Sequence, residues 1–151
     1  HEVYKDGSIT YINQNKDEVS SYSSIDEFVK GENIQGLFFN RELEIQKIVY
    51  SELDGNKKIV FNPLDQNKVF SIRVDSYDAF GIEYNSNNYK KDTTNSGIDV
   101  WIYEKTNTST EKGTTQIMFN INKWYYCINT SYPENVIELI DNFEEILPWK
   151  K

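Results

Sequence analysis

Short runs in which apolar and polar residues alternate are the feature of this sequence that most restricts its fold. Phe70, Ile72 and Val74 alternate with Ser71 and Arg73, and a period of two residues places one set on the buried face of a β-strand. Alanine, the best helix former, occurs once, whereas tyrosine occurs 11 times and phenylalanine 8 times, which favours strands. We therefore predict an α+β fold: a twisted antiparallel sheet of about six or seven strands, with a short N-terminal helix and a C-terminal amphipathic helix packed on one face.

Turn residues divide the chain into the expected strands. Asp6-Gly7 predicts a hairpin between Val3-Tyr4 and residues 8–12, and Asp54-Gly55 predicts a second hairpin, because this dipeptide readily adopts positive φ angles. In the strand before Asp54, the odd-numbered apolar residues from Leu43 to Leu53 are expected to face the core. Further strands are expected at 57–62, 70–74, 98–104, 116–121 and 123–129, with 98–104 in the middle of the sheet. Residues 84–97, rich in Asn, Ser, Lys and Thr, are expected to form an exposed loop.

Two segments carry helix signals. Ser24-Ile25-Asp26-Glu27 has the spacing of a capping box, and Gly31 follows as a C-terminal stop. The capping spacing recurs at Ser131 to Glu134, with Pro133 in the first turn. The apolar residues that follow at helical spacing, and that are expected to pack on the sheet, are Val136, Ile137, Ile140, Phe143 and Leu147.

Length and charge set the class of protein. The chain of 151 residues suits one domain spanning 1–151, in which 1–35 holds the N-terminal hairpin and short helix and 36–147 the sheet and final helix. The formal net charge of -8 has the wrong sign for attraction to phosphate backbones, so we expect no nucleic-acid partner. No apolar run reaches the length of about 18 residues that a membrane span needs, so we expect no membrane insertion by this chain. Because it begins at His1, we expect a signal peptide or membrane anchor to lie in a preceding segment.

The residue types that carry most catalysis are scarce. His1 is the only histidine and Cys127 the only cysteine, so a catalytic triad or a His/Cys metal site lacks its parts, and we expect no cofactor and no metal. Cys127 lies between aromatic and aliphatic neighbours and is expected to be a buried, inert thiol. Asp75-Ser76-Tyr77-Asp78 lacks the alternation of a calcium loop. A third and weaker hypothesis is a glycoside hydrolase that uses two carboxylates at a set distance across a cleft. The chain has 24 acidic residues, so some pair would meet that distance by chance and the signal is weak.

Aromatic residues in the C-terminal half are the best candidates for a binding site. They are Trp101, Tyr103, Trp124, Tyr125 and Tyr126, from strand segments expected to be neighbours. Rings occur at both odd- and even-numbered positions of these strands, so they point to both faces of the sheet. One face therefore cannot hold all of them. We therefore select Trp101, Tyr103, Trp124 and Tyr125 as candidate ligand-binding residues. The alternative is that all are packing residues, with the C-terminal helix covering one face of the sheet and the N-terminal segment part of the other.

The same region carries a family resemblance. Gly97-Ile98-Asp99-Val100-Trp101-Ile102-Tyr103-Glu104, then Trp124-Tyr125-Tyr126-Cys127-Ile128 leading into Ser131-Tyr132-Pro133-Glu134-Asn135-Val136-Ile137, resembles an uncharacterised extracytoplasmic domain family of lipoproteins and anti-sigma-factor-like membrane proteins of low-GC Gram-positive bacteria. The resemblance covers roughly residues 36–147. It implies a domain outside the cytoplasmic membrane that is not an enzyme, and it carries over no catalytic residue.

From the resemblance and the aromatic residues together we expect a non-catalytic binding or sensing domain, the outer part of a membrane-anchored regulator or a lipoprotein. Its ligand would be a peptide, a lipid or a cell-wall fragment, whose binding changes contacts with a neighbouring segment. The main alternative is a carbohydrate-binding module that stacks sugars on Trp101, Trp124 and Tyr125.

Overall fold

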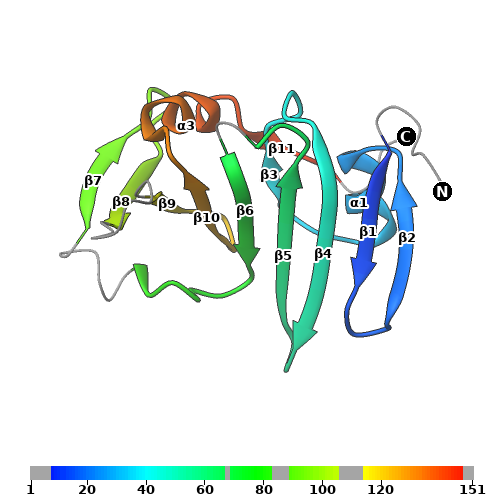
Figure 1. The fold of residues 1–151 in the computed structure, drawn as a ribbon. Coiled ribbons are helices and arrows are strands. Elements are labelled where there is room, and N and C mark those ends of the chain that lie inside the picture. Colours follow the sequence, from blue (N-terminus) through cyan, green and yellow to red (C-terminus); the bar gives the residue numbers. More distant parts are fainter. Residues whose placement is uncertain (1–7, 67–68, 83–88, 106–113, 148–151) are drawn as a thin grey trace.

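A nine-stranded sheet forms the body of the protein in the computed structural model, which describes residues 8–66, 69–82, 89–105 and 114–147 (Figure 1). The strands follow one another across the sheet in the order β2-β1-β4-β5-β6-β10-β9-β8-β7. Their bounds are β1 Ile9–Asn13, β2 Glu18–Tyr22, β4 Ile45–Leu53, β5 Asn56–Pro63, β6 Val69–Asp75, β7 Lys90–Thr93, β8 Asp99–Lys105, β9 Thr114–Ile121 and β10 Trp124–Thr130. A separate two-stranded sheet pairs β3 Phe38–Phe39 with β11 Glu144–Glu145, and the helices are α1 Ile25–Gly31 and α3 Pro133–Ile140.

All neighbouring strands of the large sheet run antiparallel except β1 and β4, which are parallel. A parallel pair cannot be joined by a tight turn, and the chain between them forms β2, α1 and β3. The helix α1 begins as its capping box predicts: the Ser24 hydroxyl accepts a hydrogen bond of 3.1 Å from the Glu27 backbone N–H. This cap satisfies one of the free N–H groups at the start of the helix.

One face of the sheet, here called the first face, carries the main core. Strand residues such as Ile48, Phe61 and Ile128 are fully buried there, against Phe28 of α1 and Val136 of α3. The strands β3 and β11 lie in the same covering layer, where Phe39 packs on Phe61 with ring centroids 4.7 Å apart. The helices α1 and α3 and the small sheet together cover the first face.

The opposite face, here called the second face, carries a row of residues in register across all nine strands. From β2 to β7 the row is Val19, Ile12, Val49, Val60, Arg73, Cys127, Met118, Trp101 and Lys91. Residues directly opposite each other on paired strands project to the same side of a sheet. The helices α1 and α3 pack on the first face. On the second face, the chain between β6 and β7 packs on Met118 and Cys127 through Ile82.

The predicted α+β class is confirmed, but the sheet has nine strands and the prediction of about six or seven is wrong. The alternation of apolar and polar residues did not predict the two edge strands, β2 and β7. In β2 only Val19 is aliphatic, and β7, within the predicted loop 84–97, reads Lys-Lys-Asp-Thr and is exposed throughout. Polar edge strands are held by backbone hydrogen bonds on one side and need no buried alternation. With β7 at the edge, the strand predicted at 98–104 (β8) is second from the edge rather than in the middle.

The predicted face of β4 is confirmed before the bulge and wrong after it. Leu43 and Ile45 face the core as predicted, but Ile48 and Tyr50 are buried in place of Val49, which belongs to the row on the second face, and Leu53 is 75% exposed. The cause is a bulge between Ile45 and Lys47, because an extra residue reverses the side to which every later side chain points. The predicted Asp54-Gly55 turn is confirmed, with φ angles of 53° and 82°.

The two ends of the fold differ from expectation. The predicted strand at Val3-Tyr4 lies outside the described residues, and Ile9–Asn13 instead pairs with Glu18–Tyr22. The C-terminal helix ends at Ile140 rather than continuing to Leu147, and its N-cap is Tyr132 with no side-chain cap, not Ser131. A turn after Ile140 brings Phe143 against Phe39, and Leu147 is 52% exposed. The chain therefore leaves the helix to form β11.

Candidate functional site

An aromatic patch lies on the second face at the β7–β10 side of the sheet. We define it as Trp101 and Tyr103 of β8, Tyr125 of β10, and Phe80 and Tyr89 from the chain between β6 and β7. Trp101, Tyr125, Phe80 and Tyr89 pack on a small buried cluster, whereas Tyr103 contacts the ring of Tyr89, with centroids 5.9 Å apart. Tyr103 is 42% exposed and the other four rings are half-buried. The patch is thus partly open to solvent.

The sheet supplies a rigid base for these rings. Met118 lies between Trp101 and Cys127 in the register of β8, β9 and β10, and Met118, Cys127 and Ile82 form the buried cluster beneath the patch. All three strands are paired on both sides. Side chains on such central strands are held in place by their neighbours, so the rings of Trp101, Tyr103 and Tyr125 stand on a rigid base.

Two cations border the patch, and each is engaged by a carboxylate and a ring. The Arg73 Nε lies 2.8 Å from the Asp75 Oδ2, and the Arg73 guanidinium lies 5.0 Å from the centre of the Phe80 ring. The Lys91 Nζ lies 3.5 Å from the Asp99 Oδ2 and 5.5 Å from the centre of the Trp101 ring. These distances allow ion pairing and cation–π attraction. Both of these cations are therefore paired within the protein.

The structure brings three of the four predicted ligand-binding residues together and separates the fourth. Trp101, Tyr103 and Tyr125 share the second face, but Trp124 projects to the first face and is 4% exposed. Its indole Nε1 donates a hydrogen bond of 2.7 Å to the Gln35 carbonyl. Trp124 is a core residue in this fold and cannot offer a stacking surface, so it leaves the candidate site. Sequence reasoning missed Phe80 and Tyr89, because neither lies in a segment with strand alternation.

The single cysteine is the chemically reactive group closest to the patch. Burial raises the pKa of Cys127 to about 12, and the Arg73 charge offsets only part of this effect. The thiolate is the reactive form, and the thiol stays protonated near neutral pH. The predicted buried position is confirmed.

We expect the folded protein to resist thiol reagents at pH 8, with complete labelling of Cys127 by dithionitrobenzoate only after unfolding in guanidinium. Because its pKa is higher in the folded than in the unfolded state, Cys127 should also make stability fall as pH rises from about 9 towards 12. Rapid stoichiometric labelling of the folded protein would contradict the structure.

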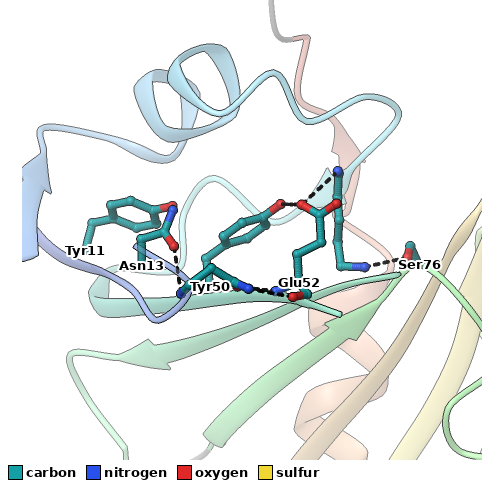
Figure 2. Close-up of polar contacts among 7 residues, drawn as sticks. Tyr11, Asn13, Tyr50, Glu52 and Ser76 are labelled. Atoms are coloured by element: carbon teal, nitrogen blue, oxygen red, sulfur yellow. Dashed lines mark hydrogen bonds and ion pairs between the residues drawn. The ribbon is translucent and has the colours of Figure 1, made fainter. Parts of the chain in front are cut away.

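A polar cluster lies at the other end of the molecule, near β1, β4 and α1. The Tyr22 hydroxyl donates to the Glu32 Oε2 at 2.6 Å, and the Tyr50 hydroxyl donates to the Glu52 Oε1 at 2.9 Å. Figure 2 shows Tyr50 pointing at the Glu52 carboxylate, and Lys57 also lies 3.6 Å from it. Burial, reinforced by the nearby Glu32, raises the pKa of both Tyr11 and Tyr22.

These contacts describe a structural cluster rather than an acid–base pair. The glutamates accept hydrogen bonds from tyrosines that hold their protons at neutral pH. The Asn15 side chain makes two hydrogen bonds to the Glu52 backbone: its amide oxygen accepts from the Glu52 N–H, and its amide nitrogen donates to the Glu52 carbonyl. The cluster joins the β1–β2 turn to β4 through Asn15, and the end of α1 to β2 through Tyr22.

A shallow cavity of about 350 Å³ lies between α3 and the turn before β4. It is lined by Asn40, Glu42, Leu43, Asn135, Glu138, Leu139 and Asn142. Asn40 is 6% exposed, and its amide donates to the Leu139 carbonyl at 3.0 Å while its Oδ1 accepts from the Glu42 N–H at 2.9 Å. Asn40 therefore serves to join the two elements.

Comparison with known proteins gives no match to any family model, curated protein or solved structure. The resemblance to an extracytoplasmic domain family therefore stays a prediction. Within the described ranges, no three His, Cys, Asp or Glu side chains gather in a way that could hold a metal ion, and no helix there has the length and apolarity to cross a membrane.

Proposed function

We propose that this chain is a non-catalytic binding or sensing domain that acts outside the cytoplasmic membrane and holds its ligand on the second face of the sheet. In this proposal it forms the outer part of a membrane-anchored regulator or lipoprotein, and its ligand belongs to the cell envelope. One observation carries the proposal: five rings, three from the sheet and two from the chain between β6 and β7, gather on the sheet face opposite α1 and α3.

The patch has the properties expected of a binding surface. Partly exposed aromatic rings on a rigid base can bury apolar area at little entropic cost. Contiguous apolar surface that is open to solvent often marks a binding site. The carboxylates beside the patch, Asp75 and Asp99, are paired with Arg73 and Lys91, which suits them to hold the surface in shape rather than to transfer protons.

Purified cell envelopes of a low-GC Gram-positive bacterium provide the test. We expect the protein to sediment with the envelopes and Tyr103→Ala to lower the bound fraction at least about twofold, because loss of a ring removes stacking and apolar contact. Tyr132→Ala is the matched control: this ring is 39% exposed, close to the 42% of Tyr103, and lies beside α3. We expect it to bind as the parent does.

Failure of the parent to sediment with envelopes would contradict the proposal. Equal binding by the parent and Tyr103→Ala would move the site away from the second face. Recovery of the native full-length protein from the cytosol alone would remove the extracytoplasmic part of the proposal.

A further inference from the structure

A row of uncharged polar side chains runs from the aromatic patch across the second face. Tyr103 of β8 lies opposite Gln116 of β9, Gln116 opposite Asn129 of β10, and Asn129 opposite Ser71 of β6. The last three are half-buried. Neighbouring strands are about 4.8 Å apart, so the four residues span roughly 14 Å. We call this set the polar row, and we propose that it binds a neutral oligosaccharide, an inference that rests on the proposed function of the second face.

The chemistry of the row matches that of a sugar chain. A sugar hydroxyl both donates and accepts hydrogen bonds, and so does each carboxamide of Gln116 and Asn129. The Asn129 Nδ2 donates to the Ser71 Oγ at 3.0 Å, which orients these two groups. In the part of the chain that the structure describes, the Gln116 carboxamide has no hydrogen-bond partner, and it is not buried. It is free to bind a ligand.

Tyr103 supplies the apolar end of the site. Its ring is 42% exposed, and Tyr89 packs against it at an interplanar angle of 68°. This edge contact helps to fix the orientation of the Tyr103 ring, and the exposed part of the ring stays open to a ligand. The C–H face of a sugar ring can then stack on it while the sugar hydroxyls reach the carboxamides.

Charge argues for a neutral ligand. The polar row contains no charged side chain, and the two cations described beside the aromatic patch are already engaged: Arg73 by Asp75 and Phe80, Lys91 by Asp99 and Trp101. A phosphate or carboxylate ligand would have to displace one of these two pairs to contact Arg73 or Lys91. An anionic lipid headgroup or an acidic peptide therefore fits the row less well than an uncharged glycan.

Backbone pairing argues against an extended peptide. Peptides that add a strand need an open sheet edge, but β8, β9, β10 and β6 each have neighbours on both sides. Only side chains face a ligand at the polar row. Recognition must then come from hydroxyl, carboxamide and ring contacts, which is the set of contacts that sugars make.

The probes are soluble cellohexaose, fully acetylated chitohexaose, laminarihexaose and mannohexaose, each titrated into the protein by calorimetry. We expect at least one to bind. Tyr103→Ala should weaken binding about twofold to tenfold, and Gln116→Leu, which keeps the size of the side chain but loses its hydrogen bonds, should have an effect of the same order. Tyr132→Ala should bind as the parent does, and circular dichroism should show that all variants are folded.

A parallel arm separates this inference from the proposed function. Envelopes treated with trifluoromethanesulfonic acid, which cleaves glycosidic bonds, should lose most of their capacity to bind the protein, whereas lipid extraction or protease treatment should not. Binding that survives cleavage of the glycosidic bonds, with no oligosaccharide bound, would overturn the glycan inference and leave the proposed function standing. Absence of binding to both envelopes and oligosaccharides would overturn both. Binding of an oligosaccharide that neither variant weakens would overturn the assignment to the polar row.

Discussion

Arg73→Met is expected to lower the free energy of unfolding by about 3 kcal/mol at neutral pH, because it leaves a buried carboxylate without its partner. The Asp75 side chain is 1% exposed, and Arg73 contacts it through Nε at 2.8 Å and through Nη2 at 3.4 Å. Methionine keeps an unbranched, flexible side chain that can still pack on Phe80. The loss then reports mainly the charge, and urea denaturation followed by circular dichroism measures it.

The matched control removes both charges. In Arg73→Met/Asp75→Asn the buried group is a neutral amide of similar size, so we expect the double variant to be more stable than Arg73→Met alone. A loss below about 0.5 kcal/mol for Arg73→Met would show that Asp75 is solvated in solution, since only exposed ion pairs contribute so little. A double variant no more stable than the single one would show that packing, not charge, is the cause.

Local sequence signals predicted those parts of the fold that local interactions determine. Ser24 and Glu27 predicted the start of α1, and the Asp54-Gly55 turn formed as expected, because caps and tight turns depend on a few adjacent residues. The alternation of Ile117 and Phe119 likewise predicted the buried side of β9. Each of these signals lies within a short stretch of chain.

The features that the sequence did not predict depend on distant parts of the chain. The bulge at Ile45 and Lys47 reverses the face of β4, and nothing in the alternation from Leu43 to Leu53 marks it. The edge strand β7 forms because β8 offers an unpaired backbone, although its residues read as a loop. The polar row also depends on register: Gln116, Asn129 and Ser71 become neighbours only when three strands pair.

The alternation of side chains along the strands predicted part of the candidate site. Trp101 and Tyr103 alternate with the buried Val100 and Ile102, which places them on the second face. Trp124 is an even number of residues from the fully buried Ile128 and points to the same face, whereas Tyr125 points to the opposite face. Alternation alone does not show which face of β10 is buried, because both faces carry mostly apolar or aromatic residues. The face that the helices cover decides it.

Tyr126→Phe is expected to lower the free energy of unfolding by about 2 kcal/mol, because one hydroxyl joins the sheet to its covering layer. The Tyr126 Oη donates to the Phe38 carbonyl at 2.8 Å and accepts from the Phe38 N–H at 2.9 Å. Tyr126 is fully buried, and this burial raises its pKa. Without the hydroxyl, both backbone groups of Phe38 lose their partner in a place that water reaches poorly.

The substitution isolates the hydroxyl because the ring contacts remain. Phenylalanine can keep the stacking on Phe119, at 4.7 Å between centroids, and the edge contact with Phe143. Tyr125→Phe is the matched control: its hydroxyl makes no hydrogen bond within the part of the chain that the structure describes, so we expect a change below about 0.5 kcal/mol. Faster hydrogen exchange at the Phe38 amide in Tyr126→Phe alone would locate the loss at β3. Equal stability of the two variants would mean that β3 is held without this contact, by the apolar packing of Phe39 and by its pairing with β11.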